Sequence, residues 1–105
     1  MSKRYHVVGV DCGASGGKMV SAYFDGERLT ENEYIPFPNR SVRVLDSLYH
    51  DFFSLYNHSL DGLARIVSQY GAPDTIGFDT HGSAHAYIDG YGRIVFPPYH
   101  QIGRA

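Results

Sequence analysis

The chain has 105 residues, of which 43% are hydrophobic, 14% aromatic and 19% charged, and its formal net charge is −2. This length allows one domain at most, and the composition is that of a globular protein. The slightly acidic balance argues against a nucleic-acid partner, and no apolar run approaches the roughly 20 residues of a membrane span. The single cysteine, Cys12, cannot form an internal disulfide, which favours a cytoplasmic location.

The first third of the chain predicts a three-strand antiparallel meander. A valine-rich run is followed by the glycine-rich stretch Cys12–Gly17, which predicts a tight loop. Asp25-Gly26, a strong hairpin signal, separates the next two runs, and Pro36 and Pro38 are expected to end the last one. The three predicted strands are Tyr5–Asp11, Lys18–Phe24 and Arg28–Ile35.

A helical pattern is expected from about Val42, with Ser41 as a plausible N-cap. Apolar residues recur there at three- and four-residue spacing, and Gly71 and Pro73 end the pattern. Asn57-His58-Ser59 is expected to interrupt it, with Ser59 capping a second segment. The apolar positions are Leu45, Leu48, Phe52, Leu55 and Tyr56, then Leu60, Leu63, Ile66 and Val67.

A lone strand, Thr75–Asp79, follows the helix and is expected to pair in parallel with Tyr5–Asp11 through a right-handed crossover. Both strands would then deliver an aspartate, Asp11 and Asp79, to the same edge of the sheet, where ligands of open α/β sheets bind. Ala84–Ile88 and Arg93–Phe96 predict a closing hairpin around Asp89-Gly90-Tyr91-Gly92.

The loop after Asp11 has the properties of a phosphate cradle. Its glycines, Gly13, Gly16 and Gly17, permit positive φ and close approach of backbone N–H groups to an anion. Ser15 adds a hydroxyl, Lys18 a point charge, and Asp11 a carboxylate that can hold Mg²⁺ through water. A plain hairpin turn with a surface lysine explains the same residues equally well.

Two common phosphate loops are excluded. A Walker loop requires a glycine where Cys12 stands and Ser or Thr where Met19 follows the lysine. The dinucleotide fingerprint requires a helix after the loop, whereas a strand is expected after Gly17. The remaining arrangement is a phosphate loop between two antiparallel strands.

This arrangement resembles the actin-like ATPase superfamily and, in detail, the rhamnulokinase-like members of the FGGY carbohydrate kinases. Their opening Val-Asp-Leu-Gly-Ala-Ser-Ser-Gly-Arg is similar to the run Val10–Lys18. Their Ile-Gly-Ile-Asp-Thr-Trp-Gly, followed by a strand and Asp-x-x-Gly, is similar to Ile76–Gly82 with Asp89–Gly92. The resemblance covers essentially the whole chain, and two motifs in the right order make it specific.

The resemblance implies an RNase H-like mixed sheet, incomplete here, and transfer of the γ-phosphoryl group of ATP to a sugar hydroxyl. The sugar pocket would be lined by Asp79, Thr80, His81 and Gly82. ATP and Mg²⁺ would lie near Asp11, Gly13, Ala14, Ser15, Gly16, Gly17 and Lys18, with Asp11 holding the metal through water.

The chain also departs from the family pattern. The family's Tyr-Arg-Asp-x-Arg aligns with Tyr99–Gly103, where only the tyrosine matches, and Arg104 falls one position late. His81 replaces the tryptophan of the second motif, which suggests an atypical sugar or loss of activity. None of the aspartates at positions 11, 46, 51 and 79 matches the family's catalytic base.

Family kinases are several times longer, so we expect an N-terminal fragment, inactive alone, whose exposed apolar surface favours dimerisation. A non-catalytic nucleotide- or sugar-binding module is the alternative. His81 and His85 could together bind zinc, but a role as polar pocket lining is favoured because they fall on a turn and a strand. Cys12 is expected to be a small buried residue and not a nucleophile.

Overall fold

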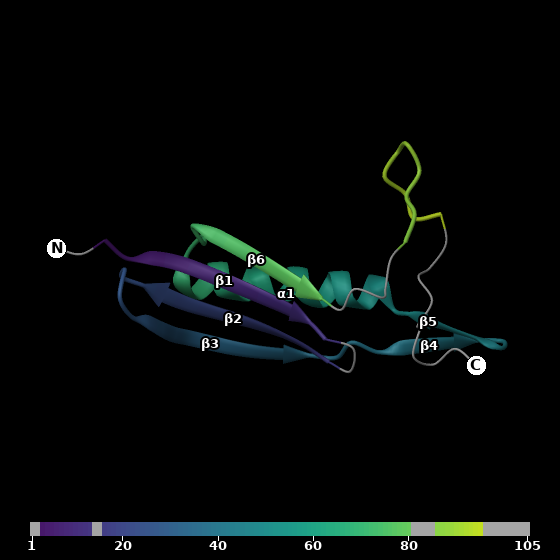
Figure 1. Ribbon diagram of the computed structural model, residues 1–105, viewed down its shortest axis with the longest axis horizontal. Coiled ribbons are helices and arrows are strands. Elements are labelled where there is room, and N and C mark those ends of the chain that lie inside the picture. The colour runs from purple at the N-terminus through teal and green to yellow at the C-terminus, as the bar shows by residue number, and fades with distance from the viewer. Residues whose placement is uncertain (1–2, 14–15, 81–85, 96–105) are drawn as a thin grey trace.

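The computed structural model describes residues 3–13, 16–80 and 86–95. Four strands form one sheet in the order β3-β2-β1-β6, and α1 (Phe52–Tyr70) lies against one face of it (Figure 1). The strands are β1 (Tyr5–Cys12), β2 (Gly17–Phe24), β3 (Leu29–Phe37) and β6 (Thr75–Thr80). A separate two-stranded hairpin, β4 (Ser41–Val44) and β5 (Ser47–His50), extends beyond the end of the sheet.

The predicted meander and the parallel strand are confirmed. β1 pairs antiparallel with β2, β2 pairs antiparallel with β3, and β6 runs parallel to β1. The turn after β2 has Gly26 at a φ of 99°, and Asp25 Oδ1 accepts hydrogen bonds from the N–H groups of Glu27 and Arg28. The mixed α/β sheet therefore follows the sequence expectation.

Pro36 does not end the third strand as expected. It lies within β3, opposite Lys18 in the register of the β2–β3 pair. β3 is an edge strand, so a residue without a backbone N–H is tolerated there.

The helix expected from Val42 is wrong for its first ten residues. Residues 41–50 form the β4–β5 hairpin, and Asp51, not Ser41, caps α1 by accepting a hydrogen bond from the N–H of Ser54 at 3.2 Å. The hairpin turn places Leu45 at a φ of 55°, a position where glycine or asparagine is the usual signal. Ser41–Val44 has the alternation of a strand, which the helical spacing of the leucines obscured.

The interruption expected at Asn57–Ser59 is also absent from α1, which is one 19-residue helix. Ser59 does not cap a second segment, because its hydroxyl donates back to the carbonyl of Leu55 at 2.9 Å. The helix ends as predicted at Gly71, whose φ is 86° and whose N–H donates to the carbonyl of Val67.

The core lies between α1 and the sheet. Gly62 lets the helix approach Met19, because a Cβ there would lie only 3.1 Å from the methionine sulfur. The buried side chains of this layer are Val8, Val10, Met19, Phe37 and Ile66. Beside them, the buried His6 Nε2 and Ser21 Oγ are hydrogen-bonded at 2.6 Å.

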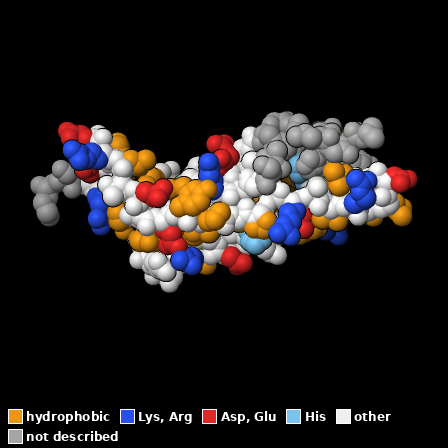
Figure 2. Space-filling model, turned by 90° about the horizontal axis from the view of Figure 1, so that it is seen from below, with side chains coloured by type: hydrophobic (Ala, Val, Ile, Leu, Met, Phe, Trp, Pro, Cys, Tyr) orange, Lys and Arg blue, Asp and Glu red, His pale blue; other side chains and the backbone are white. Residues whose placement is uncertain are grey.

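Apolar side chains also remain exposed, in line with the expectation of uncovered surface. Phe78 on β6 is 64% exposed, and Phe53 and Leu60 on α1 are 65% and 48% exposed. Figure 2 shows apolar side chains interleaved with charged ones along the molecule, including its end at the β4–β5 hairpin. Within the described ranges, no helix combines the length and apolar character that a membrane crossing requires.

The last described segment, residues 86–95, contains the predicted turn. Ile88 and Ile94 form an antiparallel bridge, and Gly92 has a φ of 83°. Asp89 Oδ1 accepts hydrogen bonds from the N–H groups of Tyr91 and Arg93. The outer ends of the expected hairpin lie outside the described residues.

Candidate functional site

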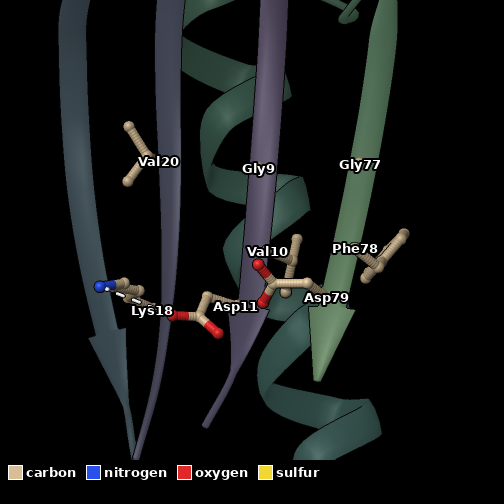
Figure 3. Close-up of a pocket in the computed structure, with 8 residues that line it drawn as sticks. All are labelled: Gly9, Val10, Asp11, Lys18, Val20, Gly77, Phe78 and Asp79. Atoms are coloured by element: carbon tan, nitrogen blue, oxygen red, sulfur yellow. Dashed lines mark ion pairs between the residues drawn. The ribbon is translucent and has the colours of Figure 1, made fainter. Parts of the chain in front are cut away.

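The two aspartates predicted to meet at one sheet edge are neighbours. Asp11 and Asp79 are register partners near the carboxyl ends of the parallel strands β1 and β6. Side chains alternate along a strand, and Val8 and Val10 pack into the core under α1. Asp11 therefore points to the opposite, open face, and Figure 3 shows Asp79 beside it there.

Lys18 joins the pair from β2. It stands opposite Asp11 in the antiparallel register, and its Nζ lies 3.5 Å from Asp11 Oδ2. Both side chains are about half exposed, at 49% and 42%, so a ligand can reach them. Figure 3 shows both carboxylates and the ammonium on this face, next to the Gly9 and Gly77 positions.

The floor of the site is an open hollow of about 390 Å³. Gly9 and Gly77 are register partners on β1 and β6, and nothing lies within 4 Å of a Cβ built at either. Their missing side chains leave the backbone of two strands accessible beside the carboxylates. The lining residues are Gly9, Val10, Asp11, Lys18, Val20, Gly77, Phe78 and Asp79.

The two carboxyl groups perturb each other in opposite directions. A hydrogen bond with Asp79, helped by the positive charge of Lys18, lowers the pKa of Asp11. The same hydrogen bond and the repulsion from ionised Asp11 raise the pKa of Asp79. Two carboxylates this close favour a shared proton, and a cation at the site would relieve the same repulsion.

Cys12 is a weak nucleophile in this setting. Partial burial and then the negative charges of Asp11 and Asp79 raise the pKa of its thiol. Because the thiolate is the reactive form, the raised pKa agrees with the expectation that Cys12 is not a nucleophile, but its side chain is only partly buried and not fully buried as expected.

Two glycines of the loop, Gly13 and Gly17, are needed for space. Neither has the positive φ that glycine permits. A Cβ at Gly13 would lie 2.8 Å from the carbonyl oxygen of Gly16, and one at Gly17 would lie 2.1 Å from the ring of Phe37. The tight turn and the packing of Phe37 therefore account for glycine at these two positions.

Two side chains from other elements hold the start of the loop. Asn39, in the link between β3 and β4, donates from Nδ2 to the carbonyl of Gly13 at 2.5 Å. Thr80, at the end of β6, donates from Oγ1 to the carbonyl of Cys12 at 3.0 Å. Asn39 could not be found from the sequence, because it lies outside both motifs and no spacing relates it to the loop.

The structure thus brings together Asp11, Lys18, Asp79 and Thr80 at one edge, with Gly13, Gly16 and Gly17 beside them. Ala14, Ser15, His81 and Gly82 lie outside the described residues, as do His85 and Tyr99–Arg104. In the described part of the chain, no three His, Cys, Asp or Glu side chains gather as a metal-binding group.

Similarity to curated sequences covers most of the chain. It is 31% identical over 90 residues to a rhamnulokinase from Bacteroides thetaiotaomicron and 34% identical over 96 residues to one from Pectobacterium atrosepticum. These alignments cover 86% and 90% of this chain but 19% of each relative. The chain therefore spans about a fifth of the length of these curated relatives. No protein-family model matches it.

Solved structures share the fold. A gluconate kinase from Lactobacillus acidophilus superposes with a TM-score of 0.72 at 9% identity, covering 92% of this chain and 20% of its own. A xylulose kinase from Brucella ovis gives 0.71 at 15% identity, again over 92% of this chain and 20% of its own. These comparisons confirm the predicted resemblance to carbohydrate kinases, and they show that the mixed sheet with its helix is a fold that the solved kinases share.

Proposed function

We propose that this chain is the N-terminal part of the first domain of an ATP-dependent sugar kinase, which transfers the γ-phosphoryl group to a sugar hydroxyl. The observation that carries the proposal is the grouping of Asp11, Asp79 and Lys18 on one open face, at the end of the parallel pair β1–β6. The similarity to rhamnulokinases over most of the chain supports it.

In this proposal Lys18, the loop from Gly13 to Gly17 and Asp11 contact different parts of Mg-ATP. Lys18 offers its ammonium to the phosphates, and the loop from Gly13 to Gly17 offers backbone N–H groups and the Ser15 hydroxyl. Asp11 holds Mg²⁺ through water, because its carboxylate is exposed and Mg²⁺ binds carboxylate oxygens while keeping several waters. Bound Mg²⁺ would neutralise charge on the phosphoryl oxygens.

The sugar side of the site would begin at the end of β6. Asp79 and Thr80 lie there, and His81 and Gly82 follow in the sequence. The altered Tyr99–Arg104 segment and His81 lead us to propose an acceptor different from the family's usual sugar. We assign no catalytic base to the 105 residues, and we propose that they do not phosphorylate a sugar alone.

The same proposal implies a cellular location and a covering for the exposed apolar residues. A cytoplasmic location is supported by the single cysteine and by the intracellular supply of ATP that the reaction consumes. The exposed apolar residues of β6 and α1 would pack against the remainder of the kinase, or against a second copy in the isolated chain. No observation on the described residues favours the non-catalytic alternative.

The test compares Lys18→Ala and Asp11→Ala in the full-length protein with a control, Lys3→Ala. Lys3 is a lysine at the other end of β1, where its Nζ lies 5.1 Å from the Tyr5 ring centroid. Calorimetry should show at least about tenfold weaker Mg-ATP binding for the two cradle variants and little change for the control. Wild-type affinity and turnover in both cradle variants would refute the assignment.

A further inference from the structure

The β4–β5 hairpin presents an open strand edge. It lies beyond the ends of the sheet strands (Figure 1), and no described strand pairs with the outer edge of β4. All four residues of β4 are exposed, whereas the four residues of β5 are half-buried. A two-stranded hairpin is at best marginally stable in water, so a further strand on the edge of β4 would stabilise it.

The tip of the hairpin carries an exposed apolar residue in an unfavourable conformation. Leu45 has a φ of 55°, and its exposed fraction is 91%. Bulky side chains rarely adopt this region of backbone space, and glycine or asparagine is the usual choice in such a turn. A leucine that is kept there, with its side chain in water, points to a role for the side chain outside this copy of the chain.

An open apolar hollow lies at the base of the same hairpin. Its volume is about 390 Å³, and it is lined by Val42 and Val44 of β4 and by Phe52 and Phe53 at the start of α1. All four of these side chains are exposed. The hairpin therefore combines an apolar residue at its tip with an apolar hollow at its base, and this surface is separate from that of β6.

Opposite charges stand at the two ends of β4. Asp46 lies at the tip, Arg40 precedes β4 at the base, and both are exposed. Neither forms an ion pair with another described residue. Two hairpins that lie side by side in antiparallel orientation bring the tip of each to the base of the other. Asp46 of one copy then meets the partner's Arg40, so the charges favour a second copy of this chain as the occupant of the edge.

The same charges select the register of such a pair. A two-fold axis perpendicular to two antiparallel strands places one residue opposite its own copy. An axis at Arg43 would place two guanidinium groups directly opposite each other, which is unfavourable. An axis at Val42 places two valines opposite each other and Val44 opposite the partner's Arg40. Asp46 is then the diagonal neighbour of the partner's Arg40, within reach of its long side chain.

We propose that β4 pairs antiparallel with β4 of a second copy about a two-fold axis at Val42, and that Leu45 of each copy packs at the hollow of the other. The strand has only four residues, so the contact falls in the class of small interfaces that bury less than about 1,200 Å². The dimer is accordingly weak, with a Kd of roughly 10–100 μM. This inference does not rest on the proposed function.

Sedimentation equilibrium of the 105-residue chain, and of the full-length protein in parallel, tests the pairing. Leu45→Gly removes the side chain and also relieves the left-handed conformation, so it should weaken the dimer at least about fivefold. The thermal midpoint Tm of the monomer, measured in dilute solution, should stay the same or rise, which separates lost association from unfolding. Leu29→Ala is the control, because Leu29 is 66% exposed at the start of β3, and its Kd should stay within about twofold of wild type.

A charge exchange tests the orientation. Asp46→Arg and Arg40→Asp should each weaken the dimer, and the double variant should recover most of the lost affinity because both ion pairs are restored with reversed sign. A chain that is monomeric at all concentrations, an unchanged Kd for Leu45→Gly, or a double variant no better than the single ones would overturn the inference. A full-length protein that stays monomeric while the chain dimerises would also overturn it, and would assign the edge to the remainder of the kinase.

Discussion

Gly17→Ala tests directly whether the loop glycines serve packing. Gly17 begins β2 opposite Phe37, the last residue of β3. An alanine Cβ at this position would lie 2.1, 2.5 and 2.8 Å from the Cε2, Cζ and Cδ2 atoms of the Phe37 ring. Carbon atoms are at their optimal separation at about 3.5–4.0 Å, so the ring must move.

The ring has little room to move. Phe37 is only 7% exposed, belongs to the core cluster and stacks on His58 of α1 with 6.1 Å between ring centroids and 14° between planes. Overpacking of this kind costs about 1–3 kcal/mol of folding free energy. For a domain of this length, each kilocalorie lowers Tm by roughly 4–8 °C.

Urea unfolding of the purified chain should therefore show Gly17→Ala destabilised by about 1–3 kcal/mol. Gly9→Ala is the control, because nothing lies within 4 Å of a Cβ there, and it should stay within about 0.5 kcal/mol of wild type. Phe37→Leu removes the Cε and Cζ atoms, so the double variant should lose less than the sum of the single losses. Equal losses at Gly17 and Gly9, or strict additivity with Phe37→Leu, would refute the packing explanation.

Two further predictions concern the helix start and the acidic pair. Asp51→Ala removes the acceptor for the N–H of Ser54 and should lower the free energy of unfolding by about 1 kcal/mol. Ser41→Ala is the control and should change this free energy by less than about 0.5 kcal/mol. Both values are measured by urea unfolding, and a larger effect at Ser41 would contradict the observed cap. Asp11→Asn should lower the pKa of Asp79 in an NMR titration, because it replaces the carboxylate whose hydrogen bond and negative charge raise this pKa. A raised folded-state pKa means that Asp79 stabilises the fold below its unfolded pKa and that this contribution is lost as the pH rises through the folded value. An unchanged Asp79 midpoint in Asp11→Asn would show that the two groups do not interact.

The sheet could be predicted because its signals are local. The valine-rich run of β1, the glycine-rich loop and Asp25-Gly26 each mark an element or a turn within a few residues. The parallel pairing of β6 with β1 followed from a general rule for strands that come after a helix. Pro36 was wrongly expected to end the third strand. A proline is tolerated inside β3 because β3 is an edge strand, and this is a property of the assembled sheet.

The hairpin at residues 41–50 was missed because two patterns compete there. Leu45, Leu48 and Phe52 have helical spacing, while Ser41–Val44 alternates as a strand does. The turn lacks the usual glycine or asparagine and places Leu45 at positive φ. Tertiary structure, not local propensity, decides whether such a segment forms a helix or a hairpin.

The candidate site was predictable only in part for a similar reason. Motifs identified Asp11, Lys18 and Asp79, and strand order brought them together. The contacts that shape the loop, from Asn39 and from Phe37, come from β3 and the link after it. No motif includes these residues, and their relation to the loop exists only after β3 has paired with β2.

The position of the acidic pair is itself a consequence of the core. Val8 and Val10 must face α1, so alternation along β1 sends Asp11 to the open face. A shift of β6 by one residue would place Phe78 beside Asp11 and turn Asp79 to the opposite face of the sheet, away from Asp11 and Lys18. The pairing register of β6 with β1 therefore puts the two carboxylates side by side, although all six residues of β6 are exposed.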